Sequence, residues 1–185
     1  MKKTALILID IQQAFDDPRW GPRNNPDAER NAARLLDAWR RAGRPVFHVQ
    51  HMSAEPDSPL RPGLPGNAIK EEVQPLDGEP LLHKSVNSAF IGTDLEQRLR
   101  AGGVDEIVTV GLTTNHCVST TARMAGNLGF RTFVVSDATA TFETTSPAGH
   151  RYTAEEMHDM GLAELSGEFA TIVTTEELLA RLEDA

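Results

Sequence analysis

Short apolar runs alternate along this chain with segments of helical periodicity, and this alternation constrains the fold more than any other feature. Six runs predict strands at residues 4–9, 45–50, 81–83, 106–110, 131–136 and 169–173, and the first of them is rich in β-branched residues. Repeated strand–helix units favour a parallel sheet with right-handed crossovers and helices on both faces. In such open sheets the reactive groups gather at the carboxyl ends of the strands.

Local signals indicate where the helices begin and end. Asn25 and Pro26 predict an N-cap and a first-turn proline for a helix over 27–41, which Gly43 closes. Residues 111–116 predict a turn into a helix over 117–128. Capping boxes are predicted at the pairs Thr93 and Glu96, Thr153 and Glu156, and Thr174 and Glu177. The stretch 51–80, rich in proline and glycine, predicts a long loop, either a functional cover or a disordered segment.

Size, charge and cysteine content exclude several classes of protein. The 185 residues suit one domain, 1–185, with one substantial core. A formal net charge of -9 disfavours nucleic-acid binding, because an acidic surface repels phosphate backbones. One cysteine permits no internal disulfide bond and fits a reducing compartment. No apolar run reaches the roughly 20 residues of a membrane span, and residues 5–9 are too few for a signal-peptide core. We therefore expect a cytoplasmic protein without membrane contact.

Three residues of different chemistry follow predicted strands. Asp10 ends the first strand, Lys84 follows the third, and Cys117 begins the helix after the fourth. Because the carboxyl ends of parallel strands share one edge, we expect these side chains to border one crevice. Each also has an inert interpretation: a turn aspartate, a solvated lysine and a buried structural cysteine.

Charge and burial predict a role for each residue. A helix N-terminus and a nearby Lys84 both lower the pKa of a thiol from its usual value of about 8.5, so we expect Cys117 to be an activated nucleophile. The apolar strand before Asp10 should raise the pKa of its carboxyl, which can then take the thiol proton and return it to a leaving amine. The backbone N–H groups of Thr113 and Cys117 are the candidates for an oxyanion hole.

Three motifs in order carry a family resemblance. Residues 5–15 (ALILIDIQQAF), 83–90 (HKSVNSAF) and 111–122 (GLTTNHCVSTTA), with Asp137-Ala138 beyond, resemble the motifs of the isochorismatase-like cysteine hydrolase superfamily. Its members include isochorismatases, nicotinamidases and N-carbamoylsarcosine amidases. The resemblance runs from about residue 4 to residue 178. It implies a three-layer α/β/α, Rossmann-like fold with a six-stranded, mostly parallel sheet.

The same resemblance implies a catalytic triad of Asp10, Lys84 and Cys117. Asp10 would be the general base and acid, Lys84 would stabilise the thiolate and orient the aspartate, and Cys117 would attack the substrate. It also implies a cis peptide bond between Leu112 and Thr113. Family members commonly form dimers or tetramers, with neighbouring chains closing the pocket, so we expect a homo-oligomer, either a dimer or a tetramer.

The histidines depart from the pattern of metal-binding relatives. Nicotinamidases of this superfamily hold a metal through an Asp-x-His pair after the second strand and a further histidine. Here the corresponding stretch reads Gln50-His51-Met52-Ser53, and no histidine pair has ligand spacing on one element. We therefore predict neither a metal nor another cofactor. A structural or hydrogen-bonding role is the simpler interpretation for each of four histidines: His48, His51, His83 and His116.

The function predicted from these residues is hydrolysis of a C–N bond, amide or carbamoyl, of a small molecule through a thioester on Cys117. One alternative is isochorismatase-type vinyl-ether hydrolysis, with Asp10 as the acid and no need for a thiol. Another is a redox-sensing or interaction protein without turnover. A dinucleotide-binding protein is disfavoured because no Gly-x-Gly-x-x-Gly follows the first strand. Six residues are predicted to line the substrate pocket: Phe15, Trp20, His51, Asn87, Phe90 and Leu112.

Overall fold

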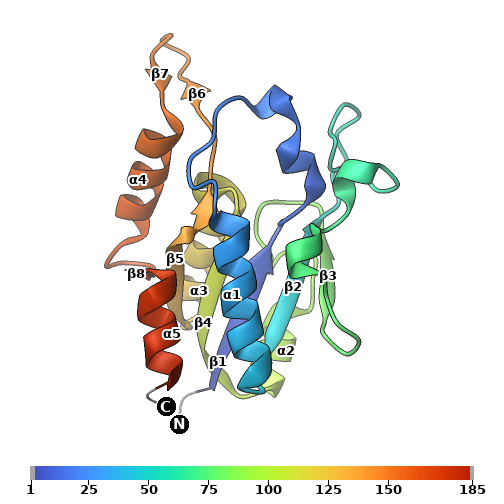
Figure 1. The fold of residues 1–185 in the computed structure, drawn as a ribbon, viewed down its shortest axis with the longest axis vertical. Coiled ribbons are helices and arrows are strands. Elements are labelled where there is room, and N and C mark those ends of the chain that lie inside the picture. Colours follow the sequence, from blue (N-terminus) through green and yellow to red (C-terminus); the bar gives the residue numbers. More distant parts are fainter. Residues whose placement is uncertain (1–2, 184–185) are drawn as a thin grey trace.

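A parallel sheet of six strands forms the centre of the computed structural model, which describes residues 3–183 (Figure 1). The strands lie in the order β3-β2-β1-β4-β5-β8, and every neighbouring pair is parallel. Their bounds are β1 (Lys3–Ile9), β2 (Val46–His51), β3 (Leu81–Lys84), β4 (Val104–Leu112), β5 (Arg131–Ala140) and β8 (Thr171–Val173). The predicted α/β fold class is confirmed.

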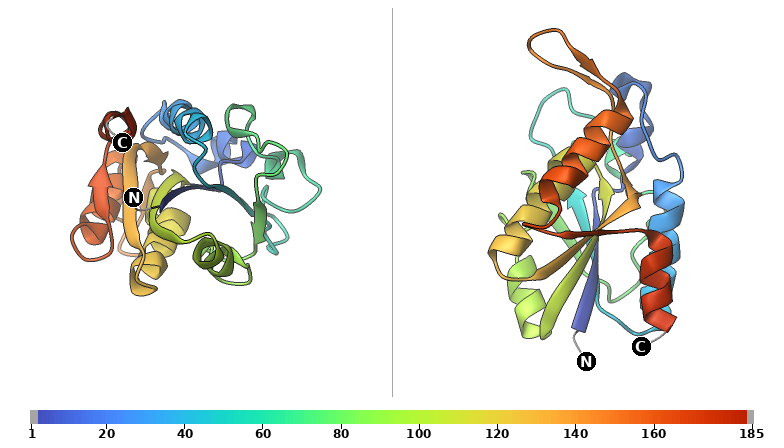
Figure 2. Two further views of the ribbon diagram at one scale, coloured as in Figure 1. Left: turned by 90° about the horizontal axis from the view of Figure 1, so that it is seen from below. Right: turned by 90° about the vertical axis from the view of Figure 1, so that its left-hand side faces the viewer.

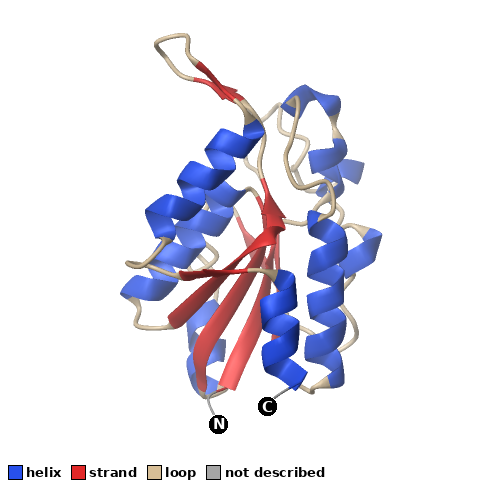
Figure 3. Ribbon diagram, turned by 60° about the vertical axis from the view of Figure 1, so that its left-hand side comes forward, coloured by secondary structure: helices blue, strands red, loops and turns tan. Residues whose placement is uncertain are grey.

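Helices cover both faces of this sheet and complete the three layers (Figure 2, Figure 3). One face carries α1 (Ala28–Arg41) and α5 (Thr175–Glu183), which contact each other. The opposite face carries α2 (Leu95–Ala101), α3 (Ser119–Asn127) and α4 (Ala154–Leu165). Within residues 3–183, no helix combines the length and the apolar character that crossing a membrane requires.

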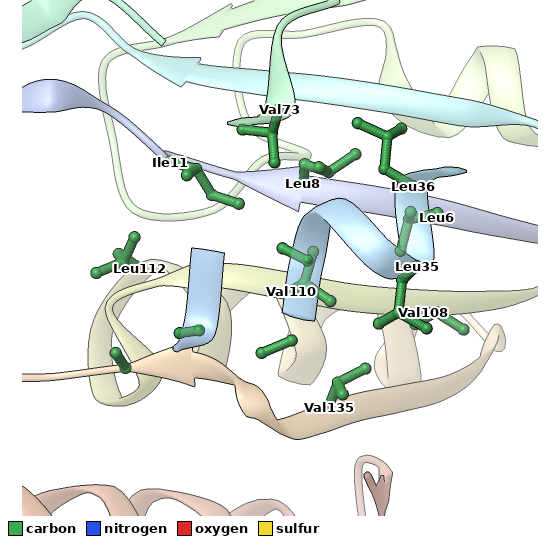
Figure 4. Packing of buried hydrophobic residues seen from close by; sticks show 14 of the residues in the cluster. Leu6, Leu8, Ile11, Leu35, Leu36, Val73, Val108, Val110, Leu112 and Val135 are labelled. Atoms are coloured by element: carbon green, nitrogen blue, oxygen red, sulfur yellow. The ribbon is translucent and has the colours of Figure 1, made fainter. Parts of the chain in front are cut away.

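Strand β1 divides the hydrophobic core, because its side chains alternate between the two faces of the sheet. Leu6 and Leu8 pack with Leu35 and Leu36 of α1, on the face seen in Figure 4. Ile7 belongs to a second cluster, which includes buried residues of α2 and α3. Burial on both faces is the reason why this strand carries an unbroken apolar run.

The strand order reverses between β1 and β4, because the chain adds β2 and β3 on one side of β1 before it crosses to β4. Ligand crevices in open α/β sheets form outside the carboxyl ends of the strands at such a point. Beside it, β1 and β4 come into close contact at Gly111, which has a φ of 125°. A Cβ atom there would lie 1.9 Å from the carbonyl oxygen of Ile9, so the pairing that positions Asp10 requires glycine.

A short antiparallel hairpin is absent from the predicted elements. It pairs β6 (Thr144–Thr145) with β7 (Arg151–Tyr152) and projects beyond the carboxyl edge of the sheet (Figure 1). Strands of two residues without an apolar run carry no periodic signal, which is why the sequence does not predict them. Strand β5, which leads into the hairpin, also continues beyond its predicted end at residue 136.

Two predicted helix caps are wrong. Asn25 does not cap α1: its φ is 43°, and its side-chain amide donates instead to the carbonyl groups of Ser136 and Thr139. The capping box at Thr93 is also absent, because α2 begins after Asp94, whose side chain makes no capping hydrogen bond. The capping boxes that open α4 and α5 are confirmed.

The long segment over 51–80 is packed against the end of β1, so it is a cover rather than a disordered loop. The Gln12 side-chain amide donates to the carbonyl groups of His51 and Asn67. The Asn67 side chain in turn donates to the carbonyl groups of His51 and Leu60. These two side chains supply hydrogen-bond donors for loop carbonyl groups that have no partner strand.

Candidate active site

The carboxyl edge of the sheet brings together the three side chains that follow predicted strands. Asp10 follows β1, Lys84 ends β3, and Cys117 lies beyond β4 in one turn of π-helix, Thr114–Val118, termed here the cysteine turn. The helix predicted to begin at Cys117 therefore starts earlier, with this turn, and continues as α3. All three side chains are buried.

Lys84 is the centre of the cluster. Its Nζ atom lies 2.6 Å from Asp10 Oδ2, 3.1 Å from His51 Nδ1 and 3.4 Å from Cys117 Sγ. An ammonium group carries three N–H bonds, so it can donate one to each of these acceptors. Because Nδ1 of His51 accepts, the ring proton of neutral His51 is on Nε2. Burial, reinforced by the charge of Lys84, lowers the pKa of His51 to about 4 and keeps the ring neutral.

Asp10 is held in an unusual conformation with one oxygen uncommitted. Its φ is 52°, a region that residues other than glycine rarely adopt, and its backbone N–H donates to Val49. Oδ2 accepts from Lys84, whereas the buried Oδ1 has no hydrogen-bond partner. Burial raises the pKa of the Asp10 carboxyl, and Lys84 opposes this shift without cancelling it. This is the predicted direction, and it favours a group that can carry a proton.

The pKa of Cys117 shifts in the direction opposite to the prediction. Burial, followed by the negative charge of Asp10, raises the pKa of the thiol to about 12, although Lys84 lowers it. The prediction counted the charges of the helix end and of the lysine but not the loss of water around the sulfur. The resting sulfur is therefore a thiol, and a nucleophilic thiolate forms only when its proton is transferred to a base.

Three potential metal ligands from distant parts of the sequence meet in this cluster. One ligand atom from each of Asp10, His51 and Cys117 lies within 4.8 Å of the other two. The Lys84 ammonium, however, already donates a hydrogen bond to each of the three. A divalent cation would have to displace this positive charge, so the residues present do not fit a metal.

A cavity of about 590 Å³ opens beside this cluster. Four of the six predicted pocket residues line it: Phe15, Trp20, His51 and Asn87. The rings of Phe15, Trp20 and Phe142 form an aromatic wall, with centroids 5.5 to 6.1 Å apart. Asn87 also lines the cavity, and its side-chain amide lies 3.6 Å from Cys117 Sγ and donates to it. The cavity thus joins an apolar wall to Asp10 and Cys117, with Lys84 behind them outside its lining.

Comparison with known protein families identifies the chain. The model described as "Isochorismatase domain" matches residues 4–177. The chain belongs to the isochorismatase family. It is therefore an isochorismatase-family hydrolase, as the three sequence motifs predict.

Relatives of this isochorismatase-family protein align over nearly all of its length. The isochorismatase family protein YrdC of Bacillus subtilis (strain 168) is 49% identical over 178 residues, 96% of this chain and 95% of that protein. Nicotinamidase 3 of Arabidopsis thaliana is 33% identical over 190 residues, 96% of this chain and 87% of that protein. A solved hydrolase of the isochorismatase family from Chromobacterium violaceum has a TM-score of 0.96 and 50% identity, covering 99% of this chain and 95% of that one.

Two predicted pocket residues of this isochorismatase-family hydrolase do not line the cavity. Leu112 is buried in the core cluster, packed among residues of the sheet and α1 (Figure 4). Phe90 belongs to the second cluster, where its ring stacks on Phe130. Both lie close in sequence to cavity residues, but the motif spacing does not specify which way a side chain turns.

The two residues predicted to form the oxyanion hole, Thr113 and Cys117, both line the cavity. The peptide bond between Leu112 and Thr113 is cis, as the family resemblance implies. The carbonyl oxygen of Thr113 accepts hydrogen bonds from the backbone N–H groups of His116 and Val118. These bonds tie the start of the cysteine turn to its end.

Several cavity residues of this isochorismatase-family hydrolase are missing from the sequence predictions. Besides Phe142, they include Arg19, Asn115, Thr141, Glu143 and Met157. Most come from segments between predicted elements, where periodicity gives no guidance. For Phe142 a weak signal exists, because it is an aromatic residue just beyond the carboxyl end of a strand. A second missed group, His158 of α4, contacts Thr114 of the cysteine turn and does not line the cavity.

Proposed function

We propose that this protein is a metal-independent cysteine hydrolase that cleaves the C–N bond of a small amide or carbamoyl compound through a thioester. The observation that carries the proposal is the shared contact of one buried ammonium with a carboxylate and a thiol. Lys84 lies 2.6 Å from Asp10 Oδ2 and 3.4 Å from Cys117 Sγ. Asp10 keeps a second oxygen without a partner, so it has the capacity to accept a proton.

The proposed reaction balances with these three residues and water. Asp10 takes the thiol proton as Cys117 Sγ bonds to the substrate carbonyl carbon, and the N–H groups of Thr113 and Cys117 stabilise the oxyanion. The C–N bond then breaks, and Asp10 gives its proton to the leaving nitrogen. A water molecule next attacks the thioester while Asp10 accepts one of its protons. Sγ leaves with that proton, and a carboxylic or carbamic acid is released.

The raised pKa of the thiol supports a role for Asp10 as the base. A sulfur with a pKa of about 12 has almost no thiolate at neutral pH, so attack must be coupled to proton transfer. It also argues against a redox sensor, because such cysteines have low pKa values and are exposed to solvent. A family relative bears the name Nicotinamidase 3, which is the name of an amidase. We include amide hydrolysis in the proposal for the present chain.

The cavity favours a flat, uncharged acyl group. Its three aromatic rings form one wall, and its charged lining residues are already paired. Asp10 binds Lys84, Arg19 binds Asp17 at 2.9 Å, and Glu143 binds Arg151. A substrate carboxylate would have to compete with these pairs, whereas an aromatic or other flat acyl group would only displace water.

The test is ammonia release from a panel of primary amides with aromatic, aliphatic and anionic acyl groups. We expect turnover of aromatic amides by the wild type, and loss of at least 1,000-fold in Cys117→Ala and Asp10→Asn, on the order of the loss from removing a catalytic nucleophile or its base. Asp77→Asn, which changes an exposed aspartate that does not line the cavity, is the matched control. Full turnover by Cys117→Ala would overturn the proposal, and hydrolysis of isochorismate by that variant would favour the vinyl-ether alternative.

A further inference from the structure

A histidine outside the cavity binds the turn that carries the cysteine. His158 lies on α4, and its Nδ1 atom is 2.8 Å from the hydroxyl oxygen of Thr114. Thr114 is the first residue of the cysteine turn and is fully buried. His158 is half-buried and does not line the cavity, so it has no direct access to a substrate there.

The neighbours of His158 determine the direction of this hydrogen bond. A backbone hydrogen bond to Ser136 raises the pKa of His158, which means that the ring donates a proton to that carbonyl. Asn25 lies 3.5 Å from Nε2, but both hydrogens of its amide already go to carbonyl groups, so Asn25 has none left to donate. Nε2 therefore carries the ring proton, and Nδ1 accepts from the hydroxyl of Thr114.

Burial keeps the ring in this form. It lowers the pKa of His158, and the nearby Asp159 and Glu155 of the same helix oppose the shift without reversing it. The groups that face the ring from other elements are a threonine, an asparagine and a carbonyl, none of which titrates. At neutral pH the ring is uncharged and has a fixed tautomer, so it acts as one acceptor and one donor in fixed places.

The rest of α4 packs against the same turn. A Cβ atom at Gly161 would lie 3.5 Å from the Cβ of Asn115, the second residue of the cysteine turn. Asn115 also accepts a hydrogen bond of 2.6 Å from the hydroxyl of Thr141. Met157, next to His158, lines the cavity. Helix α4 thus contacts the first two residues of the cysteine turn, through Gly161 and through His158.

We propose that His158 is a positioning residue, which holds the cysteine turn through Thr114 so that the N–H groups of Thr113 and Cys117 stay aimed at the substrate carbonyl. This inference rests on the proposed function. Displacements of about 1 Å in such a constellation cost on the order of 100-fold in rate. Losing the bond between Thr114 and His158 should therefore lower kcat without changing the aromatic wall that sets KM.

The test compares Thr114→Val, which removes the hydroxyl at nearly constant shape, with Thr114→Ser, which keeps it. We expect Thr114→Val and His158→Phe each to lower kcat about 10- to 100-fold, with KM changed less than about twofold. The double variant should be no worse than either single one, because both remove the same bond. Thr114→Ser should recover most of the rate. Met160→Gln, at an exposed position of α4, is the control for that helix.

Alkylation of Cys117 by iodoacetamide separates positioning from loss of the nucleophile. This displacement reaction needs the sulfur but no oxyanion hole, so its rate should stay within about twofold of wild type in Thr114→Val. A merely structural defect would expose the buried sulfur and speed its alkylation while turnover falls. Alkylation of Thr114→Val that differs from wild type by more than about twofold in either direction, or turnover equal to wild type, would overturn the proposal.

Hydrogen exchange tests the contact independently of any substrate. The backbone N–H groups of His116 and Val118 donate to Thr113 and report on the order of the turn. We expect both amides to exchange about 10-fold faster in Thr114→Val than in Thr114→Ser. Unchanged exchange would overturn the positioning role. If exchange changes as expected but the wild type hydrolyses no amide, the proposed function fails instead.

Discussion

At the scale of single residues, the Lys84 ammonium determines the state of three other groups. Its contact with Nδ1 assigns the tautomer of His51, and its contact with Oδ2 leaves the other oxygen of Asp10 without a partner. It also lowers the pKa of the Cys117 thiol, although burial and the charge of Asp10 outweigh that effect. The lysine therefore holds the thiol and the carboxylate together and leaves the proton on the sulfur.

The raised thiol pKa predicts slow alkylation at neutral pH. Because Cys117 has a pKa of about 12, the rate of its reaction with iodoacetamide should rise about 10-fold for each pH unit between pH 7 and pH 9, without a plateau. Asp10→Asn removes the negative charge that opposes the thiolate. We expect this variant to alkylate about 10-fold faster at pH 8, as one pKa unit requires, even though it should not hydrolyse amides.

The matched control is Asp77→Asn. Its alkylation rate should depend on pH as in the wild type, because Asp77 is exposed and does not line the cavity. A plateau below pH 8 in the wild type would mean that Cys117 is an ordinary or activated thiolate. Slower alkylation in Asp10→Asn would mean that Asp10 promotes the thiolate in the resting enzyme. Either result would contradict the electrostatic account given for the site.

Removal of Lys84 should create a metal site. Asp10, His51 and Cys117 each offer a ligand atom within 4.8 Å of the others, and the ammonium occupies their common centre. In Lys84→Met the three ligands lose their only shared cation, so we expect the variant to bind Co²⁺ with thiolate-to-metal absorption. The wild type should bind none at the same concentration. Equal binding by both proteins, or binding that survives an added Cys117→Ala change, would contradict this account.

At the scale of elements, a buried ion cluster joins the segments that border the cavity. Glu29, in the first turn of α1, accepts two hydrogen bonds from Arg23 and one of 2.8 Å from Lys70. Lys70 also donates to Asp16, in the short helical turn that includes Phe15. The cluster therefore fixes α1, the segment before it and the loop over 51–80 relative to one another.

Glu29→Gln should destabilise the protein in a pH-dependent way. Burial alone would raise the pKa of Glu29, but the hydrogen bonds and charges of Arg23 and Lys70 hold it at about 2. A lowered pKa stabilises the fold above the unfolded value of about 4.3, and this contribution fades as the pH falls toward 2. We expect Glu29→Gln to lower the free energy of unfolding by roughly 2–3 kcal/mol at pH 7.

Urea denaturation of wild type and Glu29→Gln at pH 7 and pH 3 measures this difference. The gap between the two proteins should shrink at pH 3, because the wild-type carboxylate then begins to lose its advantage. Glu177→Gln is the contrasting variant, since a glutamine can keep the exposed capping box that Glu177 forms, so this change should alter stability little at either pH. An equal gap at both pH values would show that the charge of Glu29 contributes nothing to stability.

At the scale of the whole molecule, the sequence predicts the sheet because its central strands β1, β4 and β5 are largely buried on both faces. Such strands leave continuous apolar runs, and their parallel order makes Asp10, Lys84 and the cysteine turn share an edge. The family assignment and the six strands could therefore be predicted. The hairpin of β6 and β7 could not, because strands of two residues depend on local pairing and not on a periodic pattern.

The interior of the site was less predictable than its position. The pKa of Cys117 depends on how much water surrounds the sulfur, and a sequence does not encode that quantity locally. Leu112 and Phe90 lie beside cavity residues in sequence, yet both side chains are buried in the core. The local backbone conformation determines the direction of each side chain, and the sequence spacing does not reveal it. His158 comes from an element remote in sequence, and only the packing of α4 on the cysteine turn reveals it.

The oligomeric state stays a prediction at this scale. Strand β3 is at one edge of the sheet, and Leu81, Val86 and Ile91 in and after it are 40 to 50% exposed. Light scattering on the purified protein gives the mass directly. We expect a multiple of the 20.2 kDa of one chain, and a mass equal to one chain would contradict the expected homo-oligomer.

The proposed mechanism requires a covalent bond between Cys117 and the acyl group of an amide. Rapid acid quenching during turnover of an aromatic primary amide, followed by intact and peptide mass spectrometry, tests it directly. We expect the mass of the acyl group on the peptide that contains Cys117, and no such adduct in Cys117→Ala. Steady ammonia release with an unmodified cysteine throughout, and equal release by Cys117→Ala, would contradict the thioester.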